Sequence, residues 1–207
     1  MKFEPYTRRE LFEHIPELEN KTVLDLGSGA FCLYGLEYIS LLANKLGKDD
    51  INRYENNVVA VDLEYDPYFG GFLDSNLIRS DAKNLPIQNQ KFDIVAAGRI
   101  LNYFRKNYNQ LSKALDEIER ILKPKGYLMG DITLYPSLAS NKILRILKVS
   151  LAWGLYMWKI DDYSKLMEKK GFKFLRKGIG LIPKEATNHL KMFFVAQKNE
   201  NFSPLSY

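Results

Sequence analysis

The chain has 207 residues and a formal net charge of +5, with 46% hydrophobic and 27% charged residues. This length and composition are typical of one globular domain with a sizeable core, and they exclude a disordered chain. The single cysteine, Cys32, excludes an intramolecular disulfide and a cysteine-rich metal site. No signal peptide or membrane span is expected, so we predict a cytoplasmic protein. The modest positive charge permits an anionic partner such as nucleic acid without favouring one.

The first part of the chain predicts a short helix, a buried strand, a glycine turn and a longer helix. Residues 8–14 have an amphipathic pattern that predicts the short helix. The apolar run 23–26 is bounded by glycine, which predicts the buried strand. It leads into Gly27-Ser28-Gly29, and the longer helix is expected over residues 31–46. Because glycine lets a ligand approach the main chain closely, this arrangement predicts a nucleotide-type binding cradle.

Strand-like and helix-like segments go on alternating through the rest of the chain. Further strands are expected over 58–61, 77–80, 92–97, 127–133, 172–175 and 192–196, and helices over 111–122 and 163–170. A polar stretch at 47–57 predicts a surface loop, and Lys123-Pro124-Lys125-Gly126 is expected to end the helix before it. Buried strands that alternate with helices predict an α/β fold with a mostly parallel sheet and helices on both faces. No linker divides the chain, so residues 1–207 are expected to form one domain.

Three of the expected strands end in, or run into, an acidic residue. These residues are Asp25, Asp62 and Asp81. In such sheets, ligands bind outside the carboxyl ends of the strands, so carboxylates along that rim predict a binding site. The alternative is that they cap helices or lie in solvated loops.

Six motifs follow one another between about residues 21 and 174. They are Val23-Leu24-Asp25-Leu26-Gly27-Ser28-Gly29, Val59-Ala60-Val61-Asp62, Ser80-Asp81-Ala82-Lys83-Asn84-Leu85-Pro86, Phe92-Asp93-Ile94-Val95, Ile121-Leu122-Lys123-Pro124-Lys125-Gly126-Tyr127-Leu128 and Glu168-Lys169-Lys170-Gly171-Phe172. In order and spacing, this series resembles the class I S-adenosylmethionine-dependent methyltransferases, particularly the small single-domain type. The resemblance implies a Rossmann-like, seven-stranded sheet and S-adenosylmethionine as the cofactor.

The resemblance implies five residues at the methionine end of the cofactor. Gly27, Ser28 and Gly29 would let the backbone pass close to the methionine part of the cofactor. Asp25 would lie near its ammonium group, where a carboxylate offsets a desolvated positive charge. Gly98 would sit beside the sulfonium and the transferred methyl group.

The resemblance also implies residues at the adenosine end. Asp62 would accept hydrogen bonds from both ribose hydroxyls, since a carboxylate accepts through two oxygens. Asp81 would accept from the adenine amine, and the Ala82 backbone N–H would meet a ring nitrogen. Leu63 and Leu85 would sandwich the adenine ring.

The chain departs from the family pattern in two ways. Phe31 stands near a position where many members have a third small residue, and the connection from Gly29 to Asp62 is longer than usual. A nicotinamide or flavin site is the nearest competing interpretation. Its fingerprint requires a third glycine at the position of Cys32 and an acid closer in sequence, so we reject it.

The sequence contains no catalytic motif, and methyl transfer does not require one. Alignment and desolvation supply much of the catalysis of an in-line displacement on an activated methyl group. At the methyl-acceptor end we expect Arg99, Asn102 and Tyr103. The other interpretation of Arg99 is that it caps a helix or pairs with an acid such as Asp131. No metal site is expected.

Residues 141–160 combine regularly spaced basic residues with an uncharged aromatic stretch. Four interpretations stay open: a core helix with a solvated basic edge, a lid or insertion over the substrate, a dimer contact, or peripheral contact of residues 142–158 with an anionic membrane surface.

These observations predict transfer of a methyl group from S-adenosylmethionine to a small-molecule acceptor. A methyltransferase that modifies RNA or protein is one alternative, favoured by the basic C-terminal third. The missing Pro-Pro motif after residues 92–97 counts against it. A non-catalytic cofactor-binding relative is the other alternative, motivated by Phe31 and the long first connection.

Overall fold

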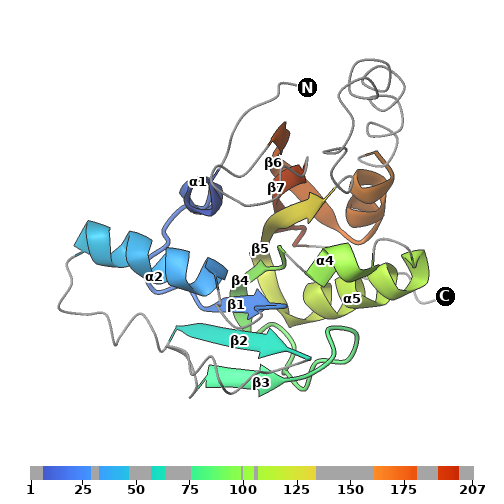
Figure 1. The fold of residues 1–207 in the computed structure, drawn as a ribbon, viewed down its shortest axis with the longest axis horizontal. Helices are drawn as coiled ribbons and strands as arrows, with labels where there is room; N and C mark the ends of the chain where they lie inside the picture. The colour runs from blue at the N-terminus through green and yellow to red at the C-terminus, as the bar shows by residue number, and fades with distance from the viewer. Residues whose placement is uncertain are drawn as a thin grey trace, which may run out of the picture.

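The computed structural model describes residues 7–28, 33–46, 57–63, 76–98, 100–104, 107–133, 161–180 and 191–200. The strands are β1 (Val23–Leu26), β2 (Val58–Asp62), β3 (Leu77–Arg79), β4 (Phe92–Ala96), β5 (Leu122–Thr133), β6 (Phe172–Gly180) and β7 (Lys191–Lys198). The helices are α1 (Arg8–Glu13), α2 (Leu33–Leu46), α4 (Ile100–Tyr103), α5 (Tyr108–Ile121) and a helix over 161–169. Figure 1 shows how these elements are arranged.

The seven strands form one sheet in the order β3-β2-β1-β4-β5-β7-β6. Neighbours from β3 to β5 are parallel, whereas β7 runs antiparallel to both β5 and β6. The predicted fold class, a mostly parallel Rossmann-like sheet of seven strands, is confirmed. From β1, the chain adds β2 and then β3 on one side of the sheet, and then returns to add β4 and β5 on the other side of β1. In sheets of this kind, such a switch point is where a ligand crevice opens.

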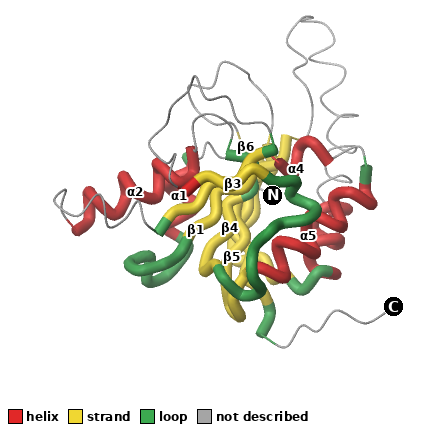
Figure 2. Tube along the Cα trace, turned by 90° about the horizontal axis from the view of Figure 1, so that it is seen from below, coloured by secondary structure: helices red, strands yellow, loops and turns green. Residues whose placement is uncertain are grey.

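Helices cover both faces of the sheet, as Figure 2 shows for α1 and α2 on one side and α5 on the other. On the first face, Phe12 and Tyr38 belong to a core that includes Val23 of β1. On the second face, Leu111 and Leu115 of α5 pack in a core that includes alternate sheet residues. Burying apolar side chains at about 25 cal/mol per Å² stabilises both layers.

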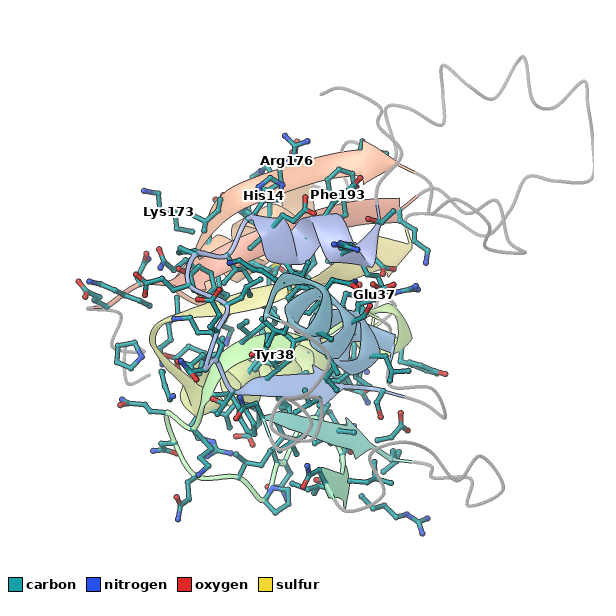
Figure 3. The ribbon with its side chains drawn as sticks, turned by 90° about the vertical axis from the view of Figure 1, so that its left-hand side faces the viewer. His14, Glu37, Tyr38, Lys173, Arg176 and Phe193 are labelled. Atoms are coloured by element: carbon teal, nitrogen blue, oxygen red, sulfur yellow. The ribbon has the colours of Figure 1, made fainter. Side chains whose placement is uncertain are left out.

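Tyr38 shows how α2 is fixed to the chain that precedes β1. Its side chain is fully buried, and its hydroxyl donates to the carbonyl oxygens of Leu18 (3.0 Å) and Lys21 (2.8 Å). Figure 3 labels Tyr38, together with His14 at the end of α1. His14 is exposed.

The sequence predicted β1 correctly at both ends, but it placed the start of β5 five residues late. Helix α5 ends at Ile121, and the strand begins at once with Leu122 instead of at Tyr127. Opposite Phe92 and Ile94 of β4, the partner residue jumps from Leu122 to Tyr127, so residues 123–126 form an irregular insertion in the strand. A proline and a positive φ of 61° at Lys125 accompany this irregularity. Residues 123–126, which were predicted to end the helix, are therefore also part of β5.

Strands β6 and β7 extend beyond the predicted residues 172–175 and 192–196. The polar residues Arg176 and Lys177 of β6, directly after the predicted end, hid its length, because this strand lies at the edge of the sheet and exposes part of its side chains. The short helix α4 was not predicted.

Several sequence-based expectations fall outside the described residues. These are the segment 141–160, most of the loop 47–57, and the residues Gly29, Phe31, Cys32 and Arg99. None of the helices that the structure describes is long and apolar enough to cross a membrane.

Candidate functional site

A pocket of about 530 Å³ opens at the carboxyl ends of β1, β2 and β3. Its floor and walls come from the glycine turn after β1, the acid at the end of β2, the turn after β3 and the short helix α4. The residues that line it include Gly27, Asp62, Leu63, Asp81, Ala82, Lys83, Ile100, Tyr103 and Phe104.

The turn after β1 depends on Gly27. Its φ of +73° lies in the left-handed region, and a Cβ added there would lie 2.8 Å from Cβ of Ile100. The Gly27 N–H donates to the carbonyl of Val61 (2.8 Å), and the Ser28 N–H donates to the same oxygen (3.2 Å). Glycine is therefore required by both conformation and space, and the turn is tied to the end of β2.

Asp62 and Asp81 bring carboxylates to this pocket from neighbouring strands. Asp62 is the last residue of β2, and its carbonyl accepts from the Ser80 N–H (2.9 Å). The Asp81 carboxylate accepts from Lys83 twice, at Oδ1 from the backbone N–H (2.9 Å) and at Oδ2 from the ammonium (2.9 Å). The backbone hydrogen bond, aided by the ammonium, holds the pKa of Asp81 below its ordinary 3.8 although burial opposes this shift. Asp81 is therefore ionised at neutral pH.

A clamp from α5 holds the chain that follows Asp81. Glu117 accepts from the Leu85 N–H (2.7 Å), and Arg120 donates to the carbonyls of Leu85 (3.0 Å) and Ile87 (2.7 Å). The two side chains also pair with each other at 2.7 Å. The Arg120 hydrogen bond lowers the pKa of Glu117 below 4.5, against the effect of burial. Leu85 itself is buried in the core beside α5 and is not among the residues that line the pocket, and its predicted place against the adenine stays a prediction.

Asp25 lies behind the glycine turn, outside the pocket lining. It is 2% exposed, and its Oδ2 accepts from the backbone N–H groups of Tyr34 and Gly35, both at 3.0 Å. These are the second and third residues of α2, so the carboxylate neutralises exposed amides at the positive end of the helix dipole. Asp25 therefore has a demonstrated role in fixing the start of α2.

Gly98 also lies beside α2, and it makes room for a buried tyrosine. A Cβ at Gly98 would lie 2.3 Å from Cε2 of Tyr34. The Tyr34 hydroxyl donates to Oδ2 of Asp131 (2.8 Å), whose Oδ1 pairs with the Lys191 ammonium at 3.2 Å. The Arg8 guanidinium lies 5.5 Å from the Tyr34 ring centroid. The acid that the sequence offered as a partner for Arg99 is thus already paired with Lys191.

Residues 24–130 match the family model of a methyltransferase domain. This match covers half of the chain, and it includes the glycine turn and both pocket carboxylates. The chain belongs to the S-adenosylmethionine-dependent methyltransferase family. The family and the cofactor class predicted from the sequence are confirmed.

This methyltransferase is also similar to individual known proteins. It is 28% identical to a demethylmenaquinone methyltransferase of Chlamydia pneumoniae over 131 residues, which are 61% of this chain and 54% of that protein. The matched region thus spans about half of the length of that relative.

Two solved structures share the fold of this methyltransferase. An S-adenosylmethionine-dependent methyltransferase of Methanosarcina mazei has a TM-score of 0.60 and 16% identity over 87% of this chain and 93% of that one. The second is the 1,6-didemethyltoxoflavin-N1-methyltransferase of Burkholderia thailandensis, solved with 1,6-didemethyltoxoflavin and S-adenosylhomocysteine. It has a TM-score of 0.57 and 13% identity, and the match covers 93% of this chain and 76% of that one.

The structure brings together only some of the residues predicted for the methyltransferase site. Gly27, Asp62, Leu63, Asp81 and Ala82 share one pocket, whereas the predicted contacts Asp25, Ser28 and Gly98 do not line it. Tyr103, predicted at the methyl-acceptor end, lines the same pocket as the carboxylates and is 79% exposed. Gly29, Arg99 and the side chain of Asn102 are outside the description.

Sequence reasoning missed Lys83, Ile100 and Phe104 as pocket residues. Lys83 lies inside a motif that the sequence analysis did quote, two residues after Asp81, and an Asp-x-Lys turn was the available signal. Ile100 and Phe104 belong to the region of the short helix α4, where the sequence has no periodic pattern that would predict a side of the pocket.

Proposed function

We propose that this protein transfers the methyl group of S-adenosylmethionine to a small-molecule acceptor. The observation that carries the proposal is the pocket in which the Gly27 turn meets the carboxylates of Asp62 and Asp81. A ligand with ribose hydroxyls and a base amine offers hydrogen-bond donors, and ionised carboxylates are acceptors only, so the two sets match.

Each pocket residue has a proposed task. Asp62 accepts from the ribose hydroxyls, Asp81 accepts from the adenine amine, and the Ala82 N–H donates to a ring nitrogen. Leu63 and Tyr103 are exposed at 55% and 79%, so they have apolar surface available to cover the base. We therefore move Tyr103 from the acceptor end to the cofactor side of the site.

When bound, S-adenosylmethionine supplies a methyl group that its sulfonium has already activated. The protein then contributes position and exclusion of water, and no strong general base is needed unless the acceptor starts protonated with a high pKa. Asp25 and Tyr34 contribute indirectly, because they hold the start of α2 immediately after the glycine turn.

Two observations support a small molecule as the acceptor. The curated relative is named for demethylmenaquinone, and one structural neighbour for 1,6-didemethyltoxoflavin. Both names denote small molecules with conjugated rings, so this class of compound is the first to test.

Calorimetric titration with S-adenosylmethionine and S-adenosylhomocysteine tests the cofactor assignment. We expect Asp62→Ala to weaken binding by about 1–3 kcal/mol, roughly a 5- to 150-fold rise in Kd, because it removes a half-buried acceptor that the bound cofactor would cover. Asp116→Ala is the matched control, since it removes an exposed carboxylate on α5 that pairs with Lys170. Unchanged affinity in a folded Asp62→Ala protein contradicts the assignment.

Turnover is tested with labelled S-adenosylmethionine and a panel of quinones and nitrogen heterocycles. Transfer to a member of this panel supports the proposal. Methylation of RNA with a steep salt dependence favours the nucleic-acid alternative instead. Cofactor binding without transfer to any acceptor favours the non-catalytic alternative.

A further inference from the structure

Lys83 lines the pocket beside Asp81, and the proposed function gives its ammonium no role. Its ammonium is 2.9 Å from Oδ2 of Asp81 and 5.2 Å from the ring centroid of Phe104, and all three residues line the pocket. The side chain of Lys83 is 28% exposed, so most of it is shielded from solvent. The cation is held between the carboxylate and the aromatic face, which both favour a positive charge.

This contact changes what Asp81 offers to a ligand. Each of its carboxylate oxygens already accepts one hydrogen bond from Lys83, from the backbone N–H at Oδ1 and from the ammonium at Oδ2. A base amine must therefore share one of these oxygens with Lys83 or displace the ammonium from Oδ2. A lysine ammonium is a donor only, whereas a carboxylate is an acceptor only. The pocket thus presents a donor and an acceptor next to each other.

A purine base can use either group, depending on its substituent at position 6. An amino group, as in adenine, donates and requires the Asp81 carboxylate. An oxo group, as in hypoxanthine, accepts, and a carboxylate alone would repel it and be left unsatisfied. A site with one kind of partner rejects the wrong base strongly, because a mismatched base leaves a buried polar group unpaired. Supplying both kinds of partner reduces the part of that penalty that arises at position 6, whereas any mismatch at a ring nitrogen stays the same in every Lys83 variant.

We propose that Lys83 is a specificity-determining residue that relaxes the selection of 6-amino over 6-oxo purine in the nucleoside part of the cofactor. The proposal rests on the proposed function, because it assumes that the base lies against Asp81. It goes beyond that function because it gives Lys83 a role in selecting the base, in addition to recognition of the base by Asp81. The ammonium competes for the carboxylate when the base is adenine, and it donates to the base when the base carries an oxo group.

The test compares S-adenosylhomocysteine with its deaminated analogue, S-inosylhomocysteine, by calorimetric titration of the full chain. The measured quantity is the ratio of the two dissociation constants, inosyl over adenosyl. Lys83→Met keeps a long apolar side chain over Phe104 and removes the donor. We expect this ratio to rise by about tenfold in Lys83→Met, because adenosyl binding gains a free acceptor and inosyl binding loses a donor.

Two controls accompany the variant. Lys83→Arg keeps a cation with several donors, so its ratio should stay close to that of the unmodified protein. Lys173→Met removes the same charge from β6, at the opposite edge of the sheet from β3, and should leave both constants unchanged.

A ratio that changes by less than about twofold in Lys83→Met overturns the proposal. Equal weakening of both ligands also overturns it, because that result means that Lys83 only maintains the turn after β3. If the unmodified protein binds neither ligand, the proposed function itself fails, and the inference fails with it. Binding of S-adenosylhomocysteine together with an unchanged ratio refutes the role of Lys83 alone.

Discussion

Replacing Gly98 by alanine should destabilise the protein, and the cost should come almost entirely from Tyr34. The three atoms nearest to a Cβ at Gly98 all belong to the Tyr34 side chain, at 2.3, 2.5 and 2.7 Å. Gly98 is not among the described glycines with positive φ, so alanine meets no backbone strain there. Tyr34 cannot move aside freely, because its ring is 3% exposed and its hydroxyl donates to Asp131.

The expected loss combines two effects. Overpacking a filled site costs about 1–3 kcal/mol, and losing a hydrogen bond to a charged group costs about 1.5–3 kcal/mol. Since moving the ring relieves part of the overpacking, we expect Gly98→Ala to lower the free energy of unfolding by about 2–5 kcal/mol. The assay is urea unfolding monitored by circular dichroism. The slope of the unfolding free energy against urea concentration, m, is compared between the variants. No ligand is present, so the result does not depend on the proposed function.

A double-mutant cycle identifies the cause. In a Tyr34→Leu background the ring is gone, so Gly98→Ala should cost at least about 1.5 kcal/mol less than in the unmodified protein. In a Tyr34→Phe background the ring stays but its hydrogen bond to Asp131 is already absent, so only the overpacking part of the cost, about 1–3 kcal/mol, should remain. Additivity of Gly98→Ala and Tyr34→Leu within about 0.5 kcal/mol would refute the reasoning.

The remaining predictions concern the buried ion pair and the clamp on α5. Lys191→Met should destabilise the protein by about 3–5 kcal/mol, because it leaves the Asp131 charge buried without its cation. Adding Asp131→Asn to Lys191→Met should restore part of this loss in urea unfolding, and a further loss would show that the charge is not the cause. Glu117 has a lowered pKa in the folded state, so its contribution to stability is present above pH 4.5 and is lost as the pH falls below that value. The difference in unfolding free energy between the unmodified protein and Glu117→Gln should therefore shrink on acidification, and a constant difference would contradict the clamp.

Local sequence patterns predicted strands β1 to β4 to within one residue at each end. The strand at 23–26 is apolar enough to be recognised because it is buried along its whole length. Strand β6 was predicted too short because its exposed lysine and arginine residues interrupt the apolar pattern. The acids at the ends of β2 and β3 were predicted to share a site because topology places neighbouring strand ends together.

The roles of Asp25, Gly98 and Tyr103 were harder to predict, because they depend on contacts between distant segments. Tyr34 and Asp131 are 97 positions apart, and neither lies in a pattern that signals a buried hydrogen bond. Motif spacing locates Gly98 at the end of β4, but it does not reveal that a tyrosine from α2 fills the space above it. Tyr103 was assigned from its position after β4, whereas the structure places it in the lining of the same pocket as Asp62 and Asp81.

The position of β7 has a consequence for folding during synthesis. β7 is the last described strand along the chain, yet it lies inside the sheet, between β5 and β6. While residues 191–198 are still within the ribosome, β5 presents an unpaired edge and β6 has no partner strand in the sheet, and such unpaired strands promote association between chains. Strands β1 to β4, which carry most of the pocket, have all emerged by then. The ligand-binding half of the sheet is therefore free to form first, and a ligand that stabilises it would protect the nascent chain while its other half waits for the final strand.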